Sequence, residues 1–395
     1  MIDDLYAWLR DPKYPAIEDA DVLAYLNAEN AYFEAAMKPH AELVETLFEE
    51  MKGRLKQDES SVPVPDGAYL YWWAFTPGAQ YRTWYRKPIA GGPDQTIFDE
   101  PVEAEGKAYF RLGAIEVSPD GRLLATMVDD DGSERFKLRV RDLETGAELE
   151  TISEVGIGAP VWTSDGKGLA FAEVNENWRS YRIRYHRLGT PASDDVTLYE
   201  EKDDPGFSVG VSKSLDASLI FIATGDNTTS EVRFVSAADP TQALTLVSTR
   251  CKGREYSVDA AHSKLWILTN DDHVNFRLAE ADPARPDEWT TVIPGSEHVY
   301  LRGHTAFRDH LAITQRVDGL DQLVLRPLQV GFGLALLSKV GHCPYRSQGP
   351  LVSIPHYQAL VVKMGEASIR FLETVIDGPP VPVARNDPFE SPNHP

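Results

Sequence analysis

One short unit recurs along most of this chain, and it limits the folds that the chain can adopt. The unit is a polar turn, an apolar strand, a second polar turn and a second strand, with Ser118–Gly121 and Ser164–Gly166 as its clearest turns. Its strands recur 45 to 51 residues apart, at Leu124, Leu169, Ile220, Leu265 and Leu311. A blade of four antiparallel strands takes roughly 40–50 residues, so each interval accommodates one propeller blade.

Two further hairpins extend this series at its ends. Tyr69–Phe98 forms one before the first regular unit, and Ser353–Thr374 forms another, with Leu360 lying 49 residues after Leu311. The pattern therefore predicts an all-β fold, a seven-bladed β-propeller over residues 61–375 whose last blade is degenerate. A two-sheet sandwich is the alternative, but a sandwich does not require a fixed repeat.

The two ends of the chain have different patterns. Between Asp19 and Met51 the apolar residues follow a helical period, and Pro39 separates two helices, so residues 1–60 are predicted to form a helical hairpin. The second helix carries an apolar stripe, formed by Leu43, Val44, Leu47, Phe48, Met51 and Leu55. Burial of each large apolar side chain yields ~1.5–3 kcal/mol, so an uncovered stripe favours self-association through these helices. Residues 376–395 include six prolines and are predicted to form a flexible tail.

The charge of the chain constrains its partners. There are 39 Lys and Arg residues against 61 Asp and Glu residues, a formal charge of −22. This negative charge disfavours binding of nucleic acid, which is itself anionic, and favours binding of short cationic peptides. Residues 1–10 lack the positive start and apolar run of a signal peptide, and no stretch is apolar enough for a membrane helix. With only Cys251 and Cys343, the chain is expected in the reducing cytoplasm.

Several segments resemble one family. Asp4–Asp11 (DLYAWLRD) resembles the opening motif Asp-x-Tyr-x-Trp-Leu-x-Asp of the prolyl oligopeptidase family of serine peptidases. Later segments resemble its oligopeptidase B branch in the branch's own order, over residues 3 to about 326. The main ones are Val117–Gly121, Arg139–Gly146, His186–Thr190, Thr229–Arg233, Glu255–Asp259, Leu268–Asp271 and Asp318–Leu320.

This resemblance implies a cytoplasmic peptidase in which a seven-bladed propeller caps an α/β-hydrolase domain, with the amino-terminal helices against the hydrolase domain. Oligopeptidase B members cut short peptides after Arg or Lys. The sequence departs from the family after about Pro327, and the 20 residues after Val375 are too few for a hydrolase domain of on the order of 200 residues. We therefore expect the gating propeller of such a peptidase, without its catalytic domain and inactive alone. A propeller that serves as a peptide- or protein-binding scaffold is the alternative.

One motif matches the sequence pattern of a serine nucleophile. Gly206–Gly210 (GFSVG) matches the Gly-x-Ser-x-Gly elbow of α/β-hydrolases, in which a strand turns sharply into a helix. Here the strand pattern continues after Ser208, so we do not expect Ser208 to be a nucleophile.

The remaining candidate groups also have simpler explanations. His298, His304 and His310 are six residues apart, wider than usual zinc-ligand spacings, and with His262 and His273 they read as turn histidines. Acid pairs could line a cation-attracting channel, but they more often lie in turns and on surfaces: Glu49-Glu50, Asp129–Asp131, Glu200-Glu201 and Asp203-Asp204. The aromatic cluster of Trp72, Trp73, Tyr81, Trp84 and Tyr85 favours core packing over a ligand platform. We therefore predict no catalytic, cofactor-binding or metal-binding residue in this chain.

Overall fold

The computed structural model describes residues 4–13, 16–156, 158–307, 310–328 and 361–363. By their contacts these residues fall into two units. The first contains the described residues up to Ser60 together with Ala74–Gln80, and the second contains Ser61–Trp73 and the described residues from Tyr81 onward. No helix within the described ranges is both long enough and apolar enough to cross a membrane.

The first unit contains the predicted helical hairpin. Its elements are η1 (Ala7–Leu9), α1 (Ala20–Met37), η2 (Lys38–His40) and α2 (Ala41–Gly53). Asp19 caps α1, because its side chain accepts hydrogen bonds from the backbone N–H groups of Asp21 and Val22. Pro39 lies in the short η2 turn between the two helices, as its lack of a backbone donor requires.

Asp11, the last residue of the opening motif, organises the entry to α1. Its carboxylate accepts backbone hydrogen bonds from Lys13 at 2.7 Å, Glu18 at 2.6 Å and Asp19 at 2.7 Å. These bonds, led by that from Asp19, lower the pKa of Asp11 below its ordinary value. In the same unit the ring of Trp8 packs edge-on against Tyr25.

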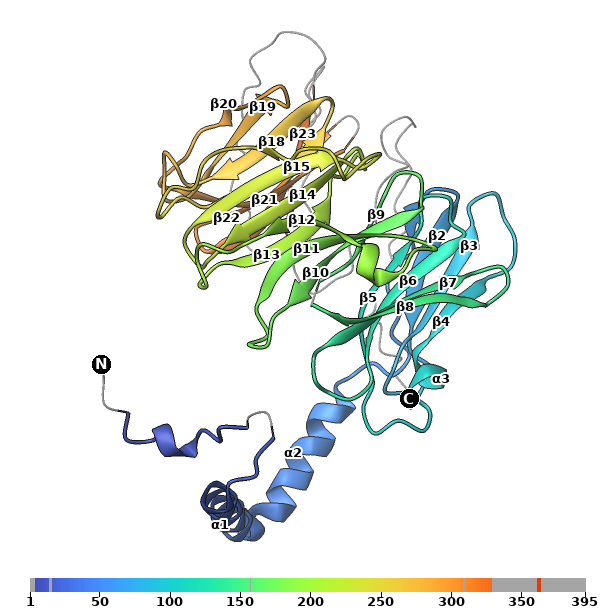
Figure 1. Ribbon diagram of the computed structural model, residues 1–395, viewed down its shortest axis with the longest axis vertical. Coiled ribbons are helices and arrows are strands. Elements are labelled where there is room, and N and C mark those ends of the chain that lie inside the picture. Colours follow the sequence, from blue (N-terminus) through green and yellow to red (C-terminus); the bar gives the residue numbers. More distant parts are fainter. Residues whose placement is uncertain (1–3, 14–15, 157, 308–309, 329–360, 364–395) are drawn as a thin grey trace, which may run out of the picture. The chain divides into compact units, whose positions relative to one another are not determined.

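The second unit consists of antiparallel β-sheets (Figure 1). Four of them have four strands each, and two further sets of four strands share one continuous sheet. The first two sheets comprise β1 (Val64–Asp66), β2 (Tyr69–Ala74), β3 (Thr83–Pro88) and β4 (Gln95–Asp99), then β5 (Arg111–Val117), β6 (Leu123–Asp129), β7 (Phe136–Asp142) and β8 (Glu148–Val155), with α3 (Glu100–Ala104) between them. The third comprises β9 (Val161–Trp162), β10 (Gly168–Val174), β11 (Ser180–Arg187) and β12 (Val196–Glu200), with η3 (Ala192–Asp194).

The last three sheets repeat this order. They comprise β13 (Ser208–Lys213), β14 (Leu219–Gly225), β15 (Ser230–Ser236) and β16 (Thr245–Leu246); β17 (Tyr256–Ala261), β18 (Lys264–Thr269), β19 (Arg277–Asp282) and β20 (Arg285–Ile293); and β21 (Val299–Ala306), β22 (His310–Val317), β23 (Leu320–Pro327) and β24 (Val361–Lys363). The second and third sheets are joined at one point, where Val155 of β8 pairs with Glu173 of β10. The sheets and the preceding helices confirm the predicted propeller fold.

The recurring turn of the sequence has a recurring hydrogen-bond pattern. Between β5 and β6, the Ser118 hydroxyl donates to Asp120 at 2.6 Å and accepts from the Leu123 N–H at 2.9 Å. Ser214 and Asp216 repeat both bonds between β13 and β14. Gly121 has a φ of +74°, which a residue without Cβ adopts at little cost. Local turn chemistry thus marks the end of the first strand in both of these sheets.

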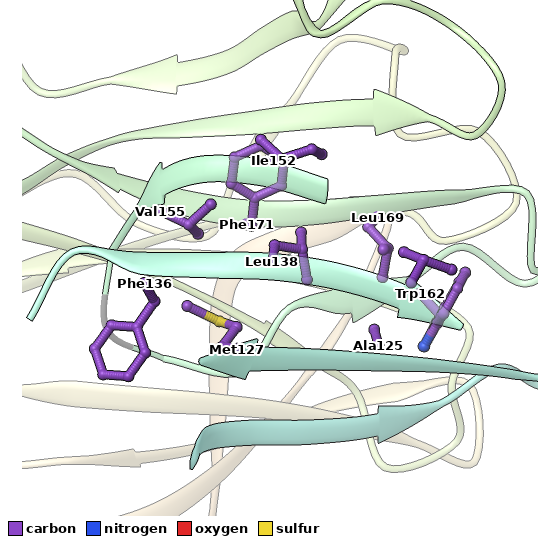
Figure 2. Close-up of a cluster of buried hydrophobic side chains, with 10 residues drawn as sticks. Ala125, Met127, Phe136, Leu138, Ile152, Val155, Trp162, Leu169 and Phe171 are labelled. Carbon is purple, nitrogen blue, oxygen red and sulfur yellow. The ribbon is translucent and has the colours of Figure 1, made fainter. Parts of the chain in front are cut away.

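A buried apolar cluster fills each seam between consecutive sheets. The cluster between the second and third sheets includes Phe136, Leu138, Trp162 and Phe171 (Figure 2). Equivalent clusters lie between the other neighbouring pairs. Each sheet is therefore covered on the face that meets its neighbour, which is how radially packed sheets bury their apolar surface.

The structure differs from the expectation at the last blade. The described residues contain six sets of four strands, whereas the sequence predicts seven blades. Val361–Lys363, expected to belong to the hairpin of a seventh blade, pairs with Gln322–Val324 as the fourth strand of the sixth sheet. The other residues of Ser353–Thr374 and the predicted tail at 376–395 lie outside the described residues.

Candidate functional site

The first strands of five sheets place ionisable side chains near the same strand end. Each of these side chains belongs to one of the last three residues of its strand. We call them the strand-end cluster: Asp66 of β1, Glu116 of β5, Lys213 of β13, Asp259 of β17 and His304 of β21. First strands contact one another directly, β9 with β13 and β17 with β21, because the sheets converge along these strands.

Charged groups on two other sheets influence the pKa of Glu116. Its partial burial raises the pKa of its carboxyl group above the ordinary value. The Lys213 ammonium group lowers this pKa, and the Asp66 carboxylate raises it further. Groups on three separate sheets, Glu116 included, therefore interact electrostatically.

His304 and Asp259 form the other part of the cluster. Burial lowers the pKa of His304, and the Asp259 carboxylate opposes this shift only in part, so the neutral imidazole is favoured. Asp259 also accepts a hydrogen bond from the Leu215 N–H at 2.9 Å, which ties β17 to the turn that follows β13. The cluster thus has three carboxyl groups, one ammonium group and one imidazole that favours its neutral form. Such groups can attract a cation.

Two arginines brace the opposite end of one first strand, β13. Arg179 donates hydrogen bonds to the backbone carbonyls of Glu201, Asp204 and Phe207, at 2.7 to 3.1 Å. Arg250 donates to the Glu201 carboxylate at 2.6 Å and lies over the Phe207 ring. These two arginines hold the loop that leads into β13.

Ser208 lies where the propeller pattern places it. It begins β13, is exposed and pairs with Gly225 of β14. A strand, β14, and no helix follows it, so the local backbone is not a nucleophile elbow. Among the described residues, no hydrogen bond joins a serine hydroxyl to an imidazole.

The weighed histidines occupy separate positions. His262 lies in a turn and bonds the Phe307 carbonyl, His273 accepts from the Asn275 N–H, and His298 is exposed. His304 and His310 lie on the neighbouring strands β21 and β22. In the part of the chain that the structure describes, no group of three or more His, Cys, Asp or Glu side chains could hold a metal ion.

His186 is a buried histidine that the sequence marks only as the first residue of the family segment His186–Thr190. Its Nδ1 lies 2.6 Å from Asp195 and its Nε2 lies 2.7 Å from Glu150, which belongs to β8 of the preceding sheet. Glu150 also accepts a bond from the Gly189 N–H. This imidazole between two carboxylates ties the second sheet to the third. Both ring nitrogens of His186 lie within hydrogen-bond distance of these carboxylates, so the imidazole supports the packing of the two sheets.

The acid pairs and aromatic residues mostly serve the fold. Asp129 accepts backbone bonds from Asp131, Gly132 and Glu134 in the turn after β6. Glu49 and Glu50 are exposed on α2, and Asp203 is exposed in the loop that Arg179 braces. Tyr81 and Trp84 pack against the apolar cluster between the first two sheets, and Trp72 stacks on Tyr85.

Comparison with known families shows to which family this chain belongs. A model of the N-terminal β-propeller domain of prolyl oligopeptidases matches residues 1–343. The chain belongs to the prolyl oligopeptidase family. The match confirms the predicted relationship and continues beyond residue 326, the expected end of the resemblance.

Individual relatives agree with this assignment. Dipeptidyl aminopeptidase BI of Pseudoxanthomonas mexicana is 33% identical over 342 residues, covering 81% of this chain and 46% of that protein. Protease 2 of Moraxella lacunata is 31% identical, over 81% of this chain and 47% of its own length. Oligopeptidase B from Leishmania major superposes with a TM-score of 0.75 at 27% identity, over 82% of this chain and 46% of that chain. This prolyl oligopeptidase family chain thus spans about half the length of these relatives.

Sequence reasoning missed the strand-end cluster and the arginine braces of this family member. Asp66, Glu116 and Lys213 are far apart in the sequence, and each looks like an ordinary strand-end charge. The repeat could have revealed the cluster. When the predicted units are aligned, these charged residues fall at equivalent positions, at the end of the first strand of each unit.

Glu116 provides a test of the cluster's electrostatics. Because burial raises its pKa in the folded state, ionised Glu116 costs stability at a pH above that pKa. This cost disappears as the pH falls below the unfolded value near 4.3. We expect Glu116→Gln to raise the melting temperature at pH 7 and to lose this advantage near pH 4, as measured by calorimetry. The exposed Glu144→Gln is the control, and an equal gain at both pH values would contradict this account.

Proposed function

We propose that this chain is the substrate-gating propeller of an oligopeptidase-B-like peptidase that acts on short peptides with Arg or Lys at the cleaved position. The gate admits short, extended peptides and excludes folded proteins from the catalytic chamber. A hydrolase domain, in the same or another polypeptide, supplies the serine nucleophile and its base. Such an enzyme acts in the cytoplasm.

The strand-end cluster is the observation that carries this proposal. It lies on the first strands, where neighbouring sheets converge, and three of its five groups are carboxyl groups. Carboxylates favour the passage of cationic side chains and disfavour anionic ones. The formal charge of −22 acts in the same direction.

The proposal predicts selective binding of basic peptides without turnover by the 395-residue chain. A fluorescent Arg-containing pentapeptide should bind more tightly than an acidic one, and the difference should shrink at high salt. The double variant Asp66→Asn, Glu116→Gln should weaken the binding of the basic peptide by about 2- to 30-fold, since charge pairs of this kind contribute about 0.2–1 kcal/mol each. Fluorescence anisotropy measures both effects, with Glu144→Gln as the matched control. Equal affinity for the two peptides would contradict charge selection.

An activity assay separates the propeller from a complete enzyme. We expect no hydrolysis of an arginyl fluorogenic peptide by this chain, because the described residues contain no serine paired with a base. Turnover blocked by a serine-directed phosphonate would refute that expectation.

A peptide- or protein-binding scaffold is the second candidate function. It is favoured by the family match itself, which is to a β-propeller domain over residues 1–343. Addition of a relative's hydrolase domain discriminates the two functions. A gate should make cleavage of short peptides faster than that of folded proteins, whereas a scaffold should leave this ratio unchanged.

A further inference from the structure

His186 lies at the seam between the second and third sheets, with a carboxylate at each ring nitrogen. Its side chain is 2% exposed and belongs to β11. Its Nδ1 lies 2.6 Å from the carboxylate of Asp195, which is between η3 and β12, and its Nε2 lies 2.7 Å from that of Glu150 on β8. The Asp195 side chain is as buried as the imidazole, whereas that of Glu150 is 20% exposed. Both nitrogens are therefore within hydrogen-bond distance of a carboxylate oxygen.

Two such contacts require two protons among the three side chains. A neutral imidazole has one N–H group and one lone pair, and an ionised carboxylate can only accept a hydrogen bond. With a neutral imidazole and two ionised carboxylates, one contact would place a nitrogen lone pair against an oxygen lone pair. One extra proton, carried by the imidazole or shared with a carboxyl group, gives each contact a donor. The observed geometry is therefore that of the group with this extra proton bound.

The surroundings of the imidazole fix one of its two carboxylate partners. Arg184, also on β11, lies 3.6 Å from the Asp195 carboxylate and donates a hydrogen bond to the Asp195 carbonyl at 3.4 Å. On β10 the residue paired with His186 is the apolar Leu169, and β12 begins with the apolar Val196. The charges that face the imidazole are thus those of the two flanking carboxylates, with the guanidinium group behind one of them.

We propose that Glu150, His186 and Asp195 form a proton-dependent clasp, which holds the second sheet against the third and opens in alkaline solution. When the extra proton leaves, one of the two contacts loses its donor. The Glu150 contact opens first, because Glu150 is partly exposed to water, whereas Asp195 is buried and paired with Arg184. The inference goes beyond the proposed gating function and does not depend on it.

The clasp closes one end of the seam, and the backbone joins the other. Val155 at the end of β8 pairs with Glu173 of β10. Glu150 lies near the start of β8 and His186 near the end of β11, away from that bridge. The clasp stabilises the seam while the extra proton is bound, and this stabilisation is lost as the pH rises and the proton leaves. Its opening should therefore be local, since the backbone bridge and the apolar cluster between the two sheets remain.

Hydrogen exchange of the full chain at pH 6 and pH 9 tests the clasp. After correction for the intrinsic exchange rate, protection of the amides at the start of β8 and the end of β11 should fall about tenfold at pH 9, because a hydrogen bond to a charged group is lost. The amides of the fifth and sixth sheets should keep their protection. Equal protection of β8 and β11 at both pH values would overturn the proposal, and an equal loss in every sheet would indicate general unfolding in its place.

Glu150→Gln separates the extra proton from the other effects of alkaline solution. The amide keeps an oxygen for the Gly189 N–H, which donates to Glu150 in the wild type, and it offers an N–H to a neutral imidazole. This variant should therefore keep the seam closed at pH 9, with the same protection at both pH values. His186→Gln, which replaces the titrating ring by an amide, should also remove the pH dependence.

Glu144→Gln is the matched control, because it makes the same chemical change in an exposed turn and should behave as the wild type does. Loss of protection at pH 9 in Glu150→Gln or His186→Gln, equal to that in the wild type, would exclude the clasp as its cause.

Discussion

Phe136→Ala is expected to lower the free energy of unfolding of the propeller unit by about 3–5 kcal/mol, the range for removing a fully buried aromatic ring. Phe136 has no exposed surface and lies in the apolar cluster between the second and third sheets (Figure 2). Gly113 of β5 lies directly beneath the ring, since a Cβ at that position would come within 2.4 Å of it. The ring therefore fills a space that no neighbouring side chain can readily take over.

Denaturant unfolding followed by tryptophan fluorescence measures this loss. Phe33→Ala is the matched control, because Phe33 is 64% exposed on α1 and its truncation should change stability by less than about 0.5 kcal/mol. Equal effects of the two substitutions would show that the seam between these sheets is not a stabilising core.

Glu201→Gln is expected to have the second largest effect, about 2–4 kcal/mol. The Glu201 side chain is 2% exposed and accepts bonds from Arg250 at 2.6 Å and from the Tyr199 hydroxyl at 2.9 Å. Breaking a fully buried ion pair costs about 3–5 kcal/mol, and the partial exposure of Arg250 reduces that figure here. The substitution should also loosen the loop before β13, which hydrogen exchange detects.

Glu201 also makes the free energy of unfolding depend on pH. Burial by itself would raise the pKa of Glu201, but bonds from Arg250, Tyr199 and the Asp204 N–H outweigh it and lower this pKa. A lowered pKa in the folded state stabilises the fold above the unfolded value near 4.3, and this stabilisation disappears as the pH falls through the folded value. Wild type and Glu201→Gln should therefore converge in acid.

Glu200→Gln is the control for both measurements. Glu200 precedes Glu201 but is more open, with Lys202 as its partner at 3.5 Å. Its substitution should cost less than about 0.5 kcal/mol and should not change the acid dependence. A loss as large as that of Glu201→Gln would show that the pair with Arg250 is not the cause.

Much of the fold was predictable because its signals are local. The bonds of Ser118, Asp120 and Leu123 that close the first turn lie within six consecutive residues, so the same short pattern marks each repeat. The helical hairpin was equally readable, from the period of its apolar residues and from Pro39. The family relationship followed from the opening motif, in which Asp11 proves to cap the entry to α1.

The last blade shows where local signals fail. The apolar residues Val361 and Val362 have the composition of a strand, but composition does not say which strand they pair with. In the structure they complete the sixth sheet beside β23, across a separation of more than 30 residues. The pairing of a strand depends on the edge that is free in the folded sheet, and that edge is a property of the tertiary structure.

The sequence by itself determined the repeat, its strands and turns, the amino-terminal hairpin and the family, because each is encoded in residues close together along the chain. Only the tertiary structure brought Glu116 near Lys213 and Asp66, and placed His186 between Glu150 and Asp195. These groups belong to different sheets or to distant turns, and their proximity arises only when the sheets pack. The candidate gate is therefore a consequence of packing, whereas the propeller that carries it is a consequence of the repeat.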